Sequence, residues 1–411
     1  MKIFNATTLV TKTDRGRVFN GILLLAVAFA FFMVAAMEAQ LSTDYNLHTR
    51  IARAISADAI LHPVHFLKNV SYPLWHFLTR IAMGVFGCSG RLAAAVVSGG
   101  CAASVFLCAV VCLSRKHRAE GFNVVLAASV LLMLAAPIYL CFFNRNLYLG
   151  QGSPNIWHNP TFLMVKAVAF PVLVGFSSLM SSMLAGIGNA EEGMAGVPWL
   201  RVAAIALGLL ATNLAKPCFM QVFFPAFCLL ALFLVVKHGK RAVRPVCCLS
   251  LVLLPSVLFM GLQYILVFDG NSDSKVAVAF LKYWRHTTPN AGISFILVSL
   301  FPLLMLVHSV KHRRFGAGDA LVWLMFVAGV LQKAVLIEEG RRMWHGNLTW
   351  GFMLAIFFVW YFAIDKFISL SRDCAGPRQR AWLVAASAAL SMHVASGMWY
   401  IWRLLIFKIH L

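Results

Sequence analysis

Charged side chains are scarce in this chain. Only 12% of its 411 residues are charged, whereas 61% are hydrophobic and the mean hydropathy is +0.81. A soluble domain of this length would need many more charges on its surface. The composition therefore excludes an ordinary water-soluble fold and indicates a protein of the lipid bilayer.

Several classes of motif are also missing. Ten cysteines are present, but no CxxC pair occurs, so neither a zinc site nor a redox motif is indicated. His62 and His65 have HxxH spacing, but a proline lies between them, and we predict no metal site there. We also predict no cofactor, with binding of a divalent ion as the alternative. The net charge of +21 comes without a basic run interleaved with aromatics, so we expect no nucleic-acid partner.

What the chain has in abundance is long apolar runs near the ~20 residues that cross ~30 Å of hydrocarbon. Backbone polar groups in hydrocarbon must bond to one another, so these runs are predicted as helices of an all-α, polytopic transmembrane bundle with about 11 spans. The predicted helices are 17–38, 91–113, 122–143, 161–185, 199–213, 218–236, 245–267, 291–310, 319–336, 348–367 and 382–404. The whole chain, 1–411, is expected to be a single membrane domain without a soluble module.

The loops between these helices alternate in charge. One set carries 18 Lys and Arg in about 70 residues, and the other carries 12 in about 115. Basic short loops face the cytoplasm, so the amino terminus is predicted inside and the carboxyl terminus outside. A bacterial inner membrane is the expected location. The segment 199–236 is too long for one span, and a break at Lys216-Pro217 would make it a hairpin, although a single kinked helix is the alternative.

The first extracytoplasmic loop, 39–90, is the longest. Within it, 72–86 is amphipathic and too short to span, so we predict a helix lying along the interface. Asp44 lies near the start of this loop. It is either a solvated loop acid or a general base, since a carboxylate can take a proton from an attacking hydroxyl.

Two further outer loops are dense in polar groups. Residues 150–161, GQGSPNIWHNPT, hold amides, an imidazole and an indole between prolines, which suit sugars and phosphates; a tight interfacial turn is the plain alternative. Residues 338–347, EEGRRMWHGN, place two arginines on the less basic side, where they would match phosphate or pair with Glu338 or Glu339. Lys166, Lys216 and Lys333 also lie toward this face, where snorkelling is the alternative to function.

This pattern resembles the GT-C superfamily of integral membrane glycosyltransferases. Those enzymes have many helices, a long first extracytoplasmic loop and a functional acid soon after the first helix. In this chain the corresponding position holds the run Asp44-Tyr45-Asn46-Leu47-His48. The likeness covers most of the chain in architecture and is specific only around Asp44. Members often have a second acid in this loop, and Asp58 is the nearest candidate here, at a loose spacing.

The resemblance implies transfer of a sugar from a polyprenyl-phosphate donor to an envelope glycan, lipid or protein, with Asp44 as general base and inversion at the sugar. The donor phosphate would be bound by Arg341, Arg342, Lys216 and His158. The substrate-binding residues would be His48, Asn155, Trp157, Asn159, Glu339 and His345. The expected partners are the lipid-linked donor and membrane lipid. A polysaccharide polymerase or ligase, and a transporter or lipid flippase, are the alternatives.

Overall fold

The computed structural model describes residues 6–56, 61–144, 151–185, 198–268 and 275–408, with side chains from residue 16 onward except at 341 and 342. Within this part the chain is almost entirely helical, as predicted. The long helices are α1 (Ala6–Leu41), α6 (Gly90–Lys116), α9 (Pro160–Ala185), α11 (Cys218–His238), α12 (Lys240–Phe268), α14 (Ala291–Lys311), α15 (Ala317–Val335), α16 (Trp350–Arg372) and α17 (Pro377–Phe407).

These nine helices, among the described residues, each contain a stretch long and apolar enough to cross a membrane. Many of their large apolar side chains face outward: on α11, Leu229, Leu232 and Phe233 are all more than half exposed. Such a surface suits lipid rather than water. The protein is therefore a multi-pass membrane protein with an all-α bundle.

Shorter elements complete the fold. The helices are α2 (Thr43–Ala54), α4 (Pro63–Asn69), α5 (Leu74–Phe86), α7 (Phe122–Leu134), α10 (Trp199–Ala215) and α13 (Lys282–Thr287), with 3-10 turns η2 (Gly340–His345) and η3 (Asn347–Thr349). Two short strands, β1 (Val276–Val278) and β2 (Leu336–Glu338), pair antiparallel with Ala277 opposite Ile337. This pairing ties the segment after α12 to the segment after α15.

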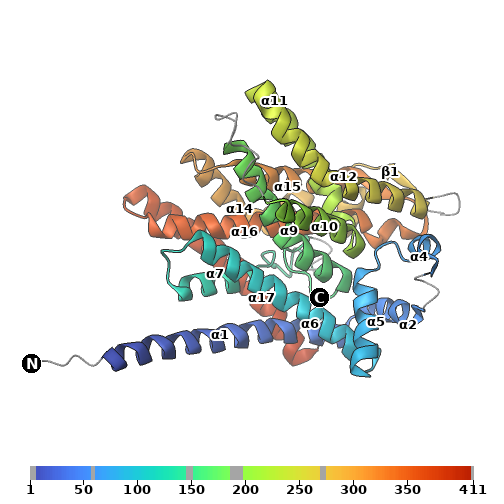
Figure 1. The fold of residues 1–411 in the computed structure, drawn as a ribbon, viewed down its shortest axis with the longest axis horizontal. Coiled ribbons are helices and arrows are strands. Elements are labelled where there is room, and N and C mark those ends of the chain that lie inside the picture. The colour runs from blue at the N-terminus through green and yellow to red at the C-terminus, as the bar shows by residue number, and fades with distance from the viewer. Residues whose placement is uncertain (1–5, 57–60, 145–150, 186–197, 269–274, 409–411) are drawn as a thin grey trace, which may run out of the picture.

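Helix α16 forms the centre of the bundle. From Trp350 to Asp365 every residue is buried, and the helix packs against α7, α11, α14 and α15. Figure 1 shows it running through the middle of the molecule, with α1 along one side. A helix that is apolar all round is stable only where other helices surround it.

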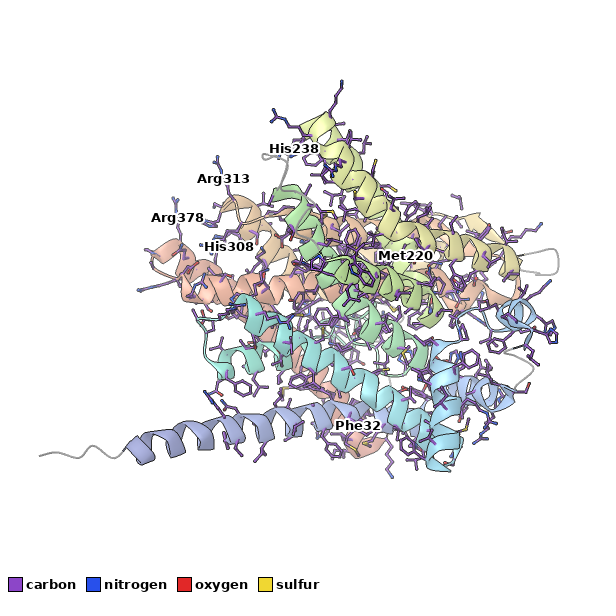
Figure 2. The ribbon with its side chains drawn as sticks, in the orientation of Figure 1. Phe32, Met220, His238, His308, Arg313 and Arg378 are labelled. Atoms are coloured by element: carbon purple, nitrogen blue, oxygen red, sulfur yellow. The ribbon has the colours of Figure 1, made fainter. Side chains whose placement is uncertain are left out.

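The two ends of the bundle differ in chemistry. Figure 1 places α2, α4, α5 and β1 at one end, on the right, while the starts of α1 and α17 lie at the other. Basic side chains mark this second end: Arg313 and Arg378 project at the upper left of Figure 2. There the carboxylate of Asp365, 1% exposed, binds Lys116 at 2.6 Å and His117 at 2.9 Å, tying α6 to α16.

The predicted break in 199–236 is confirmed. Helix α10 ends at Ala215, Lys216 is extended with φ −175°, and α11 begins at Cys218. Asn213 donates to the carbonyl of Ser256 at 2.7 Å, which holds the end of α10 against α12. The 17-residue α10 therefore reaches this junction and the chain turns back through α11.

The helix predicted at 122–143 is shorter in the structure, because α7 ends at Leu134. Pro137 lacks an amide hydrogen and disfavours helix before it, so the chain becomes extended. Its freed backbone groups are bound by neighbours: the Ile138 amide donates to Leu297 O at 2.8 Å, and His393 Nδ1 binds Ala136 O at 2.6 Å. Irregular backbone at this depth is stable because protein groups replace the missing helical bonds.

Candidate functional site

Asp44 lies in a helix rather than in an irregular loop. Ser42 caps α2, its hydroxyl accepting a hydrogen bond from the Asp44 amide at 3.3 Å and donating to the His158 carbonyl at 3.0 Å. The acid thus sits in the first turn of α2, where the helix dipole favours negative charge. The predicted amphipathic helix of the same loop is also present, as α5.

The side chain of Asn159 joins Asp44 to Lys216. Asn159 Nδ2 donates to Asp44 Oδ2 at 2.9 Å, and its Oδ1 accepts from Lys216 Nζ at 3.2 Å. The same oxygen accepts from the Thr161 hydroxyl at 3.0 Å and the Phe162 amide at 2.9 Å, which fixes the orientation of the amide. An acid and a base 172 positions apart in sequence are therefore linked through one side chain.

Lys216 is almost completely buried, with 6% of its surface exposed. Its Nζ also donates to Thr161 Oγ1 at 3.3 Å and lies 3.8 Å from the ring centroid of Trp350. Burial lowers the pKa of Lys216 to about 8, while Cys218 and Asp44 act in the opposite direction. The ammonium is held in place by neutral oxygens and an aromatic face, so much of its charge is available to an anion.

A histidine pair lies beside this linkage. Helices α2 and α5 each bury one face, and His48 Nδ1 meets His76 Nε2 at 2.9 Å between them. Burial lowers the pKa of His48 to about 3 and that of His76 to about 4, with the neighbouring His76 and Lys216 adding to the effect on His48. Both rings are therefore neutral at pH 7, with one ring donating to the other.

The segment 151–160 is buried within the bundle rather than lying open on its surface. Asn155 Nδ2 donates to the carbonyls of Leu132 and Ala135 at 2.8 and 2.9 Å, while its Oδ1 accepts from Lys166 Nζ at 2.9 Å. Trp157 is buried and stacks on Phe31, with ring centroids 6.2 Å apart. In this structure Asn155 and Trp157 hold the segment in place, and only Asn159 from this segment binds Asp44 directly.

The two acids of the 338–347 segment differ in burial and in hydrogen bonding. Glu339 and His345 are exposed, whereas Glu338 is buried and accepts from Asn347 Nδ2 at 2.7 Å. Arg341 and Arg342 lie in η2, and their side chains fall outside the described residues. Both the predicted phosphate contacts of these arginines and the alternative pairing with Glu338 or Glu339 therefore fall outside the described residues.

Sequence reasoning missed several members of the cluster. Thr161, His76 and Trp350 were not singled out as site residues, because a threonine, a histidine and a tryptophan at these positions have no distinguishing pattern. Thr161 follows Pro160 at the start of α9, and only the helix geometry directs its hydroxyl toward Lys216. No cluster of three or more potential metal-binding His, Cys, Asp or Glu occurs among the described residues.

The chain was also compared with known proteins. No protein-family model matches it, and the search of curated proteins found no relative.

Proposed function

We propose that the protein is a membrane glycosyltransferase that moves a sugar from a polyprenyl-phosphate donor to an envelope glycan, lipid or protein. The observation that carries this proposal is the Asp44–Asn159–Lys216 linkage at one end of a transmembrane bundle. Sugar transfer from a phosphate needs a base for the attacking hydroxyl and a cation for the departing phosphate. The linkage supplies one of each.

Asp44 is the proposed general base. Its Oδ2 is bound by Asn159, while Oδ1 makes no hydrogen bond to any part of the chain that the structure describes. The carboxylate is half-buried, so an acceptor hydroxyl can reach it. As the hydroxyl oxygen bonds to the anomeric carbon, Asp44 takes its proton, the bond from that carbon to the phosphate oxygen breaks, and the configuration inverts.

Lys216 is the proposed partner of the leaving phosphate. The polyprenyl phosphate takes the electron pair of the broken bond, and an ammonium in a desolvated site stabilises that charge far better than it would in water. The apolar helix surfaces suit the polyprenyl tail. Further phosphate contacts are proposed from His158, Arg341 and Arg342. His48, Glu339 and His345, besides Asn159, are the proposed sugar contacts.

The site would face the extracytoplasmic side. The basic end of the bundle, which carries Arg313 and Arg378, is opposite the end with α2 and α5. Since basic termini of helices are retained in the cytoplasm, the Asp44 end would be outside, as in a bacterial inner membrane.

A transporter is the second candidate. The buried, irregular segment 151–159 and the extended chain after α7 interrupt the helical pattern inside the bundle. Transporters place such breaks around a substrate site. A substrate would then cross the membrane unchanged, which distinguishes this candidate from a transferase.

The test is a transfer assay on the purified full-length protein in lipid vesicles. Radiolabelled polyprenyl-phosphate sugars are offered with a membrane extract as acceptor, and the product is separated by chromatography. Wild type is expected to transfer sugar, and Asp44→Asn to lose about 10²–10⁴-fold of that rate, the usual contribution of a general base. Asparagine still accepts from Asn159, so folding should be retained.

Asp373→Asn is the matched control, because Asp373 pairs with Arg314 and Arg372 away from Asp44. It should leave transfer unchanged. Full activity in Asp44→Asn would refute the assignment of the base. No product from any donor, together with solute flux across the vesicle, would favour the transporter.

A further inference from the structure

Lys333, near the end of α15, is a buried cation that has no hydrogen-bond partner among the residues the structure describes. Only 1% of its surface is exposed, and its Nζ makes no hydrogen bond within the described part of the chain. Placing an ionisable group in a membrane bundle is costly, and such groups usually mark a functional site with a partner. The question is what Lys333 could bind.

Two aromatic rings hold the Lys333 ammonium. Its Nζ lies 4.5 Å from the centroid of Trp284 and 4.7 Å from that of Phe352. Trp284 belongs to α13, and the segment just before this helix contacts the end of α15, where the Ala279 amide donates to Val335 O at 2.8 Å. The β1–β2 pairing continues this contact, so backbone hydrogen bonds hold Trp284 in its position beside Lys333.

Other donors on α13, the helix that carries Trp284, are also unsatisfied. Trp284 Nε1 and the Tyr283 hydroxyl are buried without hydrogen-bond partners among the described residues. Burial raises the pKa of Tyr283 to about 12, so its hydroxyl keeps its proton. Indole nitrogen and ammonium groups can only donate, and the hydroxyl can donate. A group of unmatched donors fits a ligand rich in acceptors.

The other two buried lysines are different. Lys166 Nζ donates to Asn155 Oδ1 and Pro154 O, and Lys216 Nζ donates to Asn159 and Thr161. Lys333 also lies on another flank of α16: Lys216 packs on Trp350, and Lys333 on Phe352. Two residues turn a helix by about 200°, so these contacts face nearly opposite directions. The two lysines therefore do not share one site.

We propose that Lys333, Trp284 and Tyr283 form a binding site for an oxyanion group, a phosphate or a carboxylate, separate from the Asp44 site. Lys333 supplies the charge, Trp284 and Tyr283 donate hydrogen bonds, and Phe352 walls the site on its apolar side. The ligand enters at the end of the bundle that carries α13, β1 and β2. This site goes beyond the proposed transfer reaction and does not depend on it.

The test measures anion-dependent stabilisation of the purified full-length protein. Thermal unfolding is followed by tryptophan fluorescence in potassium chloride, phosphate or acetate at equal ionic strength. Wild type should be stabilised by phosphate, acetate or both in a saturable manner, since a ligand of the folded state raises the midpoint. The better of the two salts identifies a phosphate or a carboxylate as the natural group.

Three variants locate the effect. Lys333→Met should raise the half-maximal anion concentration by at least about tenfold, as expected from losing one charged hydrogen bond. Trp284→Phe keeps an aromatic ring beside Lys333 but removes the N–H, and should weaken the effect without unfolding the protein. Lys216→Met should retain it, whether or not that variant transfers sugar.

A wild type that gains nothing over chloride would overturn the proposal. So would a Lys333→Met variant that keeps the full effect, because general salting effects of phosphate do not depend on one lysine. Loss of the effect in Lys216→Met with retention in Lys333→Met would assign the anion to the Asp44 site and equally overturn it.

Discussion

Replacing each of two buried lysines by methionine should affect stability differently: Lys166→Met should lose stability, and Lys333→Met should not. Lys166 and Lys333 are both 1% exposed, both lie in membrane-spanning helices and both contact aromatic rings. They differ in hydrogen bonding, since Lys166 Nζ donates to Pro154 O and Asn155 Oδ1. Methionine has nearly the same length as lysine but donates nothing, so the pair isolates those two bonds.

The magnitudes follow from the partners that are left behind. In Lys166→Met two buried acceptors lose their donor, at about 1–3 kcal/mol each, about 2–6 kcal/mol together. Relief from burying a charge offsets part of this cost, and we expect a net loss of about 2–4 kcal/mol. In Lys333→Met no hydrogen bond to the described residues is lost. The variant loses a cation–π interaction of about 2 kcal/mol and no longer has the desolvation cost of several kcal/mol for burying a charge. We expect that variant to equal or exceed wild type.

The assay is reversible unfolding in mixed micelles. Dodecyl sulfate is titrated into the protein in a mild detergent, and unfolding is followed by the fluorescence of the 11 tryptophans. The unfolding free energies of the two variants are compared with wild type at one pH and salt. Equal losses in both variants, or a Lys166→Met protein as stable as wild type, would refute the assignment of partners.

Two further predictions concern packing and pH. Gly397→Ala should destabilise the protein by about 1–3 kcal/mol, because a Cβ there would collide with the Leu134 carbonyl oxygen. Gly100→Ala is the control: it has open space around it and should be neutral or stabilising. Equal melting midpoints for the two variants would contradict the predicted collision. The folded-state pKa values of His48 and His76 lie below the ordinary 6.5, so the unfolded chain binds more protons below pH 6.5. The unfolding free energy should therefore fall as pH drops from 6.5 toward 4, by up to about 1.4 kcal/mol per pH unit for each histidine. The His76→Gln variant should show a smaller dependence of the unfolding free energy on pH. A dependence equal to that of wild type would refute the prediction.

The sequence by itself determined the class of fold and most of its helices. Apolar runs of sufficient length must become helices in hydrocarbon, and the prediction of an all-α polytopic bundle follows from that rule alone. Pro217 likewise marked the break between α10 and α11, because a proline cannot continue the helix before it. The segment 122–143, in which the helix has only 13 residues, shows the limit of the rule.

Only the tertiary structure decided which polar residues meet. Asp44 stood out in the sequence because acids are rare, but its contact with Asn159 and the contact of Asn159 with Lys216 join three distant segments. The three lysines near one end of the bundle were indistinguishable in sequence. Packing brought the 151–161 segment to Lys166 and Lys216, which gave both lysines hydrogen-bond partners. Within the described part of the chain it left Lys333 beside aromatic rings without a hydrogen bond, because these contacts depend on which segments the fold brings together.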